Sequence, residues 1–110
     1  ETESKQSSLI RDFALSPAYP NPATVLSTLT LQLPRPAFVQ YRIIDVLGRA
    51  VVQAGPVRYG VGRYPLAWSG RDDGGVVLPT GIYIMQVEAS ACDGTDPVLW
   101  KTVQKIVRIH

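Results

Sequence analysis

Apolar and polar residues alternate along much of the chain. In the run TLTLQL, Leu29, Leu31 and Leu33 share one face, and threonine and glutamine occupy the other. The same period of two recurs between residues 39 and 43. A period of two is typical of β-strands with one buried side. We therefore expect strands in these runs, and no segment of the chain shows a convincing amphipathic helix.

Short β-rich runs follow one another along the whole sequence and are separated by glycine and proline. Seven strands are predicted, at 10–15, 25–33, 38–46, 49–54, 63–68, 81–89 and 98–109. Turn residues lie between them at 34–36, 47–48, 60–62, 73–75 and 93–94. This spacing of strands and turns predicts an all-β sandwich of about seven antiparallel strands.

The stretch PTGIYIM has the spacing of a tyrosine corner. Gly81 is followed by Tyr83 and then Met85 at intervals of two. In a tyrosine corner, the hydroxyl of a tyrosine near the start of a strand bonds to upstream backbone. An ordinary aromatic side chain in an ordinary strand would give the same letters. We expect Tyr83 and Met85 to face the core together with Val87.

Two prolines stiffen the stretch AYPNPA, which precedes the first long alternation. Proline fixes its own φ and pushes the preceding residue away from helix. Tyr19 and Asn21 each precede a proline, so the stretch is predicted to be an extended elbow. We expect this elbow to end the first strand and to aim the second.

Length and composition favour one compact domain. The chain has 110 residues, of which 45% are hydrophobic and 18% charged. Residues 1–8 contain no apolar side chain and are expected to be a linker, so the domain is assigned to 9–110. Because the chain begins at Glu1 and its single methionine is Met85, it is expected to be a piece of a longer protein.

The net charge of +2 is unevenly distributed. Four arginines and no acid lie between residues 49 and 71, and three basic residues with no acid follow position 97. Such stretches could bind nucleic acid or acidic lipid. Solvated outer strand faces are the favoured interpretation, because aromatic residues are not interleaved as they are in single-strand binders. We therefore expect no nucleic-acid partner.

Candidate catalytic and metal-binding residues are sparse. The single histidine is His110 and the single cysteine is Cys92, which is too few for a zinc site or a recognisable nucleophile motif. Asp72 and Asp73 could supply oxygen ligands to calcium, but turn formation explains them better. Trp100 could belong to an exposed aromatic platform or close a loop against the sheet. The chain is expected to have no enzymatic activity, cofactor, metal or small-molecule substrate.

The ordered set of motifs resembles the type A C-terminal sorting domain of the type IX (Por) secretion system, a family similar to the Ig-like domain of the flagellar hook-capping protein. In order, the motifs are Tyr19-Pro20-Asn21-Pro22, Asp45-Val46-Leu47-Gly48-Arg49, Trp68-Ser69-Gly70-Arg71-Asp72-Asp73-Gly74-Gly75, Gly81-Ile82-Tyr83 and Lys105-Ile106-Val107-Arg108-Ile109. The resemblance covers residues 13–110. It implies an Ig-like β-sandwich whose structural motif residues are Pro20, Asn21, Pro22, Asp45, Gly48, Arg49, Trp68, Asp73, Gly74, Gly81 and Tyr83.

The resemblance also implies a function without catalysis. The module would form part of a larger secreted protein, pass through the periplasm, and direct that protein across the outer membrane to the cell surface. Its partner would be the outer-membrane type IX machinery. The implied sorting residues are Lys101, Lys105, Ile106, Val107, Arg108 and Ile109. The chain departs from the family in its longer loop at 91–99 and in its final histidine.

The predicted last strand decides how a partner could recognise the module. Its imperfect alternation is interpreted with Val103, Val107 and Ile109 toward the core, and with Gln104, Ile106 and Arg108 outward. A basic strand at a sheet edge can be recognised by strand pairing and by charge.

The alternative function is a non-sorting Ig-like accessory module, serving as a spacer or as a binder of carbohydrate or protein in an extracellular enzyme or adhesin.

Overall fold

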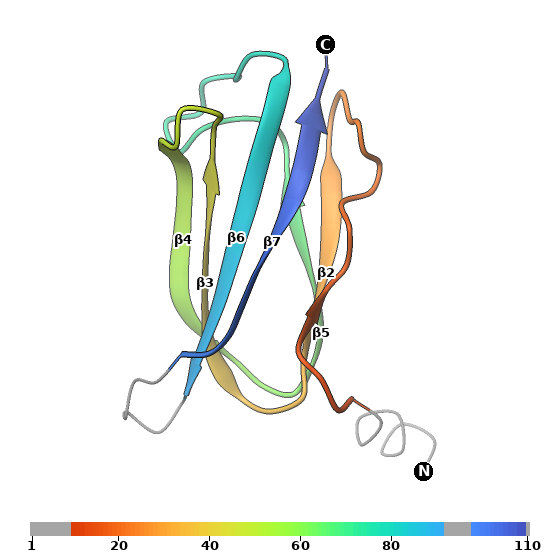
Figure 1. Cartoon of the computed structure of the whole chain (residues 1–110), viewed down its shortest axis with the longest axis vertical. Coiled ribbons are helices and arrows are strands. Elements are labelled where there is room, and N and C mark those ends of the chain that lie inside the picture. Colours follow the sequence, from red (N-terminus) through yellow and green to blue (C-terminus); the bar gives the residue numbers. More distant parts are fainter. Residues whose placement is uncertain (1–9, 92–97, 110) are drawn as a thin grey trace.

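Seven β-strands make up the computed structural model, which describes residues 10–91 and 98–109 (Figure 1). The predicted leader at 1–8, Cys92 and His110 lie outside the described residues. The strands are β1 (Ala14–Leu15), β2 (Ser27–Leu33), β3 (Ala37–Ile44), β4 (Ala50–Tyr59), β5 (Gly62–Trp68), β6 (Gly81–Ala91) and β7 (Val98–Arg108). Their number and order confirm the predicted all-β fold.

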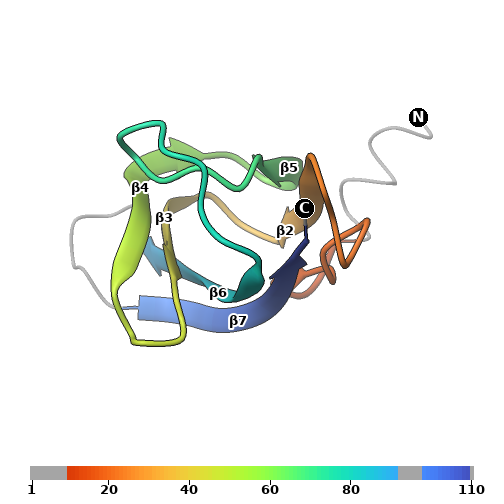
Figure 2. The ribbon, with the colours of Figure 1, turned by 90° about the horizontal axis from the view of Figure 1, so that it is seen from above.

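The strands form two antiparallel sheets. One sheet has the order β1-β2-β5, and the other has the order β4-β3-β6-β7. Viewed from above, the two sheets lie as layers on either side of the core (Figure 2). In constant-type immunoglobulin domains the fourth strand belongs to the sheet of the first two strands. Here β4 pairs with β3 instead, which gives an Ig-like sandwich of three plus four strands.

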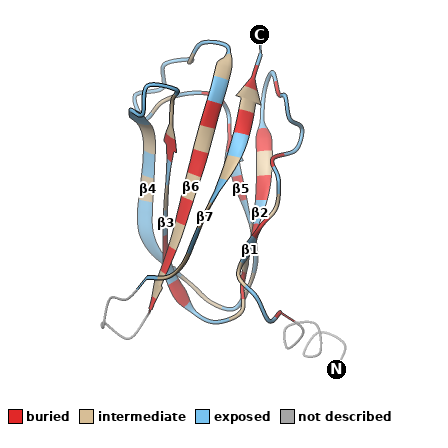
Figure 3. Cartoon of the chain, viewed as in Figure 1, coloured by how far each residue is buried: buried red, intermediate tan, exposed pale blue. Residues whose placement is uncertain are grey.

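The core lies between the inner faces of the two sheets, and burial alternates along the strands (Figure 3). On β2, Leu29, Leu31 and Leu33 are fully buried. On β6, Met85 and Val87 face them from the other sheet. Each such side chain contributes about 1.5–3 kcal/mol relative to an exposed one. The period of two predicted for these strands is confirmed.

β4 extends five residues beyond its predicted end at Ala54. The chain continues as a strand through Gly55 and Pro56, where the register with β3 shifts between Val39 and Tyr41. Gly55 has a φ of 91°, and a Cβ placed there would lie 2.5 Å from the carbonyl oxygen of Val39. The Gly-Pro pair therefore forms a β-bulge within the strand. In the sequence alone, the same two residues indicate a turn, which is why the strand was predicted to end before them.

The tyrosine corner is confirmed. Tyr83 is buried, and its hydroxyl donates a hydrogen bond of 2.7 Å to the carbonyl oxygen of Pro79. Its ring meets Trp68 edge to face at 5.1 Å. Burial raises the pKa of the Tyr83 phenol. This contact fixes the entry to β6 against β5 of the opposite sheet.

Among the described residues, no helix is long and apolar enough to cross a membrane.

Candidate functional site

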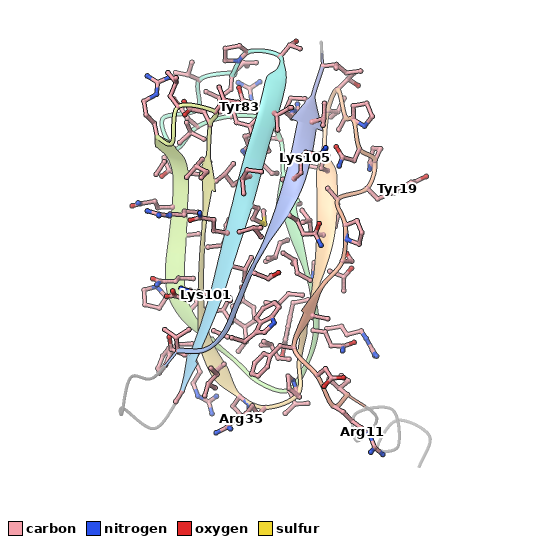
Figure 4. All side chains as sticks on the ribbon, viewed as in Figure 1. Arg11, Tyr19, Arg35, Tyr83, Lys101 and Lys105 are labelled. Atoms are coloured by element: carbon pink, nitrogen blue, oxygen red, sulfur yellow. The ribbon has the colours of Figure 1, made fainter. Side chains whose placement is uncertain are left out.

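On the terminal strand β7, the side chains point to the opposite faces of the sheet from those predicted. Ile106 is fully buried and Arg108 is 7% exposed, whereas Val103 is 55% exposed. Lys101 and Lys105 also point outward (Figure 4). The prediction that Ile106 and Arg108 face outward, and that Val103, Val107 and Ile109 face the core, is therefore wrong. β7 pairs with β6 in a register that places Ile106 beside buried Tyr83.

Arg108 is an internal structural residue. Its Nη1 donates to the carbonyl oxygen of Val25 at 2.8 Å, and its Nη2 donates to those of Thr24 at 3.2 Å and Ser69 at 3.1 Å. The guanidinium also lies over the Trp68 ring, with its central carbon 5.6 Å from the ring centroid. Burial lowers the pKa of Arg108, although an arginine stays charged at neutral pH.

Gly70 makes room for this arginine. Its φ is 83°, and a Cβ added there would lie 2.4 Å from Nη2 of Arg108. Trp68, below the guanidinium, donates its indole N–H to the carbonyl oxygen of Arg71 at 2.9 Å. The motif residues from Trp68 to Arg71 and the motif residue Arg108 therefore form one packed unit, which joins the end of β5 to the end of β7.

The proline-rich elbow covers the outer edge of β7. The backbone of Ala23 forms two hydrogen bonds with that edge. The N–H of Ala23 donates to the carbonyl oxygen of Val107 at 2.9 Å, and the carbonyl oxygen of Ala23 accepts from the N–H of Ile109 at 3.0 Å. The Asn21 side chain adds two more, donating to the carbonyl oxygen of Lys105 at 3.1 Å and accepting from the N–H of Val107 at 2.7 Å. The edge is thus occupied from Lys105 to Ile109.

The same N-terminal segment also contacts the rest of β7. Phe13 stacks on Trp100 with ring centroids 5.4 Å apart. The amide of Gln104 donates to the carbonyl oxygen of Leu15 at 2.9 Å. We call residues 13–23 the strap. Trp100 accordingly packs against the strap.

The strap also bonds to the other sheet. Tyr19 exchanges two backbone hydrogen bonds with Thr28 of β2, at 3.0 and 2.9 Å. The strap therefore bridges β2 and β7. As predicted, the elbow leads into β2. It is not fully extended, because the chain bends between Tyr19 and Ala23, where the Tyr19-Pro20 and Asn21-Pro22 peptide bonds are both cis.

Asp45, the first residue of the motif DVLGR, stabilises the turn from β3 to β4. The Asp45 carboxylate accepts from the N–H groups of Leu47 at 2.9 Å and Arg49 at 3.0 Å, and forms an ion pair with the Arg49 guanidinium at 2.9 Å. The hydrogen bond from the Arg49 N–H is the largest cause that lowers the pKa of Asp45. Gly48 has a φ of 83°. Asp45 and Arg49 therefore pair across a glycine turn.

The acidic loop after β5 uses its carboxylates for turn formation. Asp72 accepts from the N–H groups of Gly74 and Val76, each at 2.9 Å. Asp73 accepts from the N–H of Gln53 on β4 at 3.0 Å. Within the described part of the chain, no group of three potential metal ligands is present. The expectations of no metal and no catalysis stay predictions.

The predicted sorting residues differ strongly from one another in burial, which the sequence prediction did not anticipate. Lys101, Val103, Lys105 and Val107 form one outward row on β7, which we call the outer row. Ile106 and Arg108 belong to the core, and Ile109 lies beyond the strand end, 39% exposed. The signal that could have found this is the position of Ile106 opposite the tyrosine corner, since that tyrosine must be buried.

Comparisons with known proteins agree with this fold. The chain is similar to part of the crystal structure of dimeric latent PorU from Porphyromonas gingivalis, with a TM-score of 0.64 and 20% sequence identity. The match covers 92% of the chain and 10% of PorU. The similarity therefore concerns one module-sized part of that protein. No protein-family model matches the sequence, and no curated protein matches it.

Proposed function

We propose that the chain is a sorting module without catalytic activity, which directs a larger secreted protein through the type IX secretion machinery to the cell surface. The observation that carries the proposal is the ordered motif set together with the PorU-like fold, because PorU shares its name with the Por secretion system. The motif residues meet in space: the elbow, the Trp68 loop and the terminal strand all converge on Arg108 and the upper edge of β7.

The outer row is the part of the terminal strand that a partner can contact. Lys101 and Lys105 present two charges on the outer face of β7, and Val103 between them is 55% exposed. The edge beside Lys105, Val107 and Ile109 is already bonded to the strap. We therefore propose recognition through the outer side chains, in place of strand pairing along that edge.

A reporter fusion tests the proposal. The 110-residue chain is fused behind a reporter that carries an inner-membrane export signal, in a bacterium with type IX machinery. Surface display is measured by accessibility of the reporter to added protease in intact cells. The wild-type fusion is expected to reach the surface, and Lys101→Glu combined with Lys105→Glu is expected to reduce display. Arg35→Glu combined with Arg63→Glu is the matched control, since it makes the same change in net charge at two exposed positions, in the loop after β2 and on β5.

Each outcome has a defined meaning. Retention of the wild-type fusion in the periplasm would contradict the sorting function and favour the accessory module. Normal display of the double variant would show that the outer row is not recognised. Deletion of residues 105–110 is a poor test here, because it removes buried Ile106 and Arg108 and so disturbs folding.

A further inference from the structure

A groove crosses the outer face of the four-stranded sheet. It has a volume of about 720 Å³ and runs across β4, β3, β6 and β7. Its floor follows one row of paired residues, Ala54, Tyr41, Val87 and Thr102. The volume lies within the range of about 300–1,000 Å³ that is typical of ligand clefts. The groove is separate from the strap and from the Arg108 unit.

Two ranks of side chains form the walls of the groove. In one rank, the Arg42 guanidinium donates its Nε–H to the Gln86 amide oxygen at 2.7 Å. In the other rank, the Gln40 amide donates to the Glu88 carboxylate at 2.8 Å. Residues two apart on a strand lie about 7 Å from each other along it. The ranks are therefore held in place by their own hydrogen bonds and present two parallel lines of polar groups to an extended chain lying across them.

The charge of this face is strongly asymmetric. Arg42 and Lys101 line the groove, and Arg58 and Lys105 lie beyond its two walls on the same face. Among the residues that line the groove, Glu88 is the single carboxylate, and it already accepts from Gln40; the Asp73 carboxylate lies at the edge of β4, where it accepts from the N–H of Gln53. The one ion pair recorded for the described part of the chain joins Arg49 to Asp45, at the turn. The lining of the groove therefore carries two positive charges and one negative charge, and two further positive charges lie beyond its walls.

The chemistry of the walls narrows the kind of partner. Gln40, Gln53 and Gln86 offer amides that can both donate to and accept from a peptide backbone. Tyr41 is the one aromatic residue along the groove, and its ring packs on the core side of the sheet. Without a stacking surface, the groove is poorly suited to nucleic-acid bases. Carboxylate side chains on an extended peptide match both its charge and its amides.

We propose that this groove binds an extended, acidic segment of a partner protein, with Arg42 and Lys101 as its principal charged contacts. The groove shares Lys101 and Val103 with the outer row, but its contacts on β3 and β6 are its own, and the proposal holds whether or not the module sorts its cargo. It would give the domain a second partner, recognised by negative charge across the middle of the sheet.

Fluorescence anisotropy of the purified 110-residue chain tests the proposal. The probe is a fluorescein-labelled peptide of alternating glutamate and serine, and a lysine-serine peptide is the comparison. Binding of the acidic peptide is expected at low salt and should weaken steeply toward about 0.15 M salt. Arg42→Glu is expected to weaken it at least about tenfold. Arg63→Glu, on β5 of the other sheet, should change it less than about twofold.

A second measurement locates the contact. Backbone amide shifts in NMR spectra should move for groove residues on β3 and β6 when the acidic peptide is added, and stay constant on β2. Equal weakening by Arg42→Glu and Arg63→Glu would overturn the proposal, because the attraction would then come from net charge alone. Tighter binding of a single-stranded oligonucleotide than of the acidic peptide would overturn the choice of partner. Neither result bears on surface display of a fusion.

Discussion

Single residues hold this sandwich together at its corners. Tyr83, Asp45 and Arg108 each use one side chain to fix backbone from a different segment. They differ in burial and charge. Substitution of each residue should therefore lower the free energy of unfolding by a different amount, and the effect at Asp45 should depend on pH.

Tyr83→Phe removes the hydroxyl and keeps the ring against Trp68. The carbonyl oxygen of Pro79 loses its partner at 2.7 Å. We expect the free energy of unfolding to fall by about 1 kcal/mol, measured by urea denaturation. Tyr64→Phe, which removes a hydroxyl bonded to the carbonyl oxygen of Gly60, is a comparison from the other sheet. Unchanged stability of Tyr83→Phe would show that the corner bond adds nothing.

Asp45 gives the turn a stability that depends on pH. Its pKa is lowered in the folded protein below its ordinary value of 3.8. A group with a lowered folded pKa stabilises the fold above its unfolded pKa, and the contribution is lost as the pH falls through the folded value. The urea midpoint of the wild type should therefore exceed that of Asp45→Asn at pH 7, and the two should converge in acid. A constant difference across this range would contradict the ionic origin.

Arg108→Met keeps most of the side-chain volume but leaves three carbonyl oxygens without their charged donor. We expect a loss of about 2–4 kcal/mol in the free energy of unfolding, measured by thermal and urea denaturation. Lys105→Met, three residues earlier and on the exposed face, should change stability by less than about 0.5 kcal/mol. Similar effects of the two substitutions would mean that Arg108 is not the internal anchor described above.

At the scale of elements, the strap determines which part of β7 is accessible. Asn21→Ala removes both side-chain bonds to β7. We expect faster hydrogen exchange at the Val107 amide, which loses its acceptor, and little change at Ile106, which pairs with Tyr83 of β6. NMR exchange rates of the two amides give the comparison within one strand. Equal acceleration at both amides would indicate loosening of the whole sheet instead.

The elements could be predicted where one period dominates. The three leucines of β2 alternate cleanly with threonine and glutamine, so their facing followed from the letters. In β6, Ile82 and Ile84 are apolar on the outer face, and the facing followed from the tyrosine-corner spacing. In β7, Val103, Ile106 and Val107 are apolar at both parities. A shift of one residue reverses every side chain of a strand, and only pairing with β6 resolves the choice. Arg108 could not be assigned either, because its three acceptors come from two loops distant in sequence.

At the scale of the whole molecule, the two proposed contact surfaces overlap at Lys101 and Val103 of β7. The strap and Arg108 occupy one side of β7, the outer row faces solvent, and the groove crosses the middle of the four-stranded sheet. The candidate sorting residues all belong to the predicted last strand, and the fold divides them between core and surface. That division follows from the pleat of β7, which sends neighbouring side chains to opposite faces.

The strap also decides how the domain responds to tension. It runs parallel to β7 where Ala23 bridges Arg108, and the described chain enters at one end of the 44 Å long axis and leaves at the other (Figure 1). A force pulling Ile10 and Ile109 apart would slide the strap along β7 in shear. The bonds at Asn21 and Ala23 would then bear the load together, so their rupture rate would set the lifetime of the domain under force.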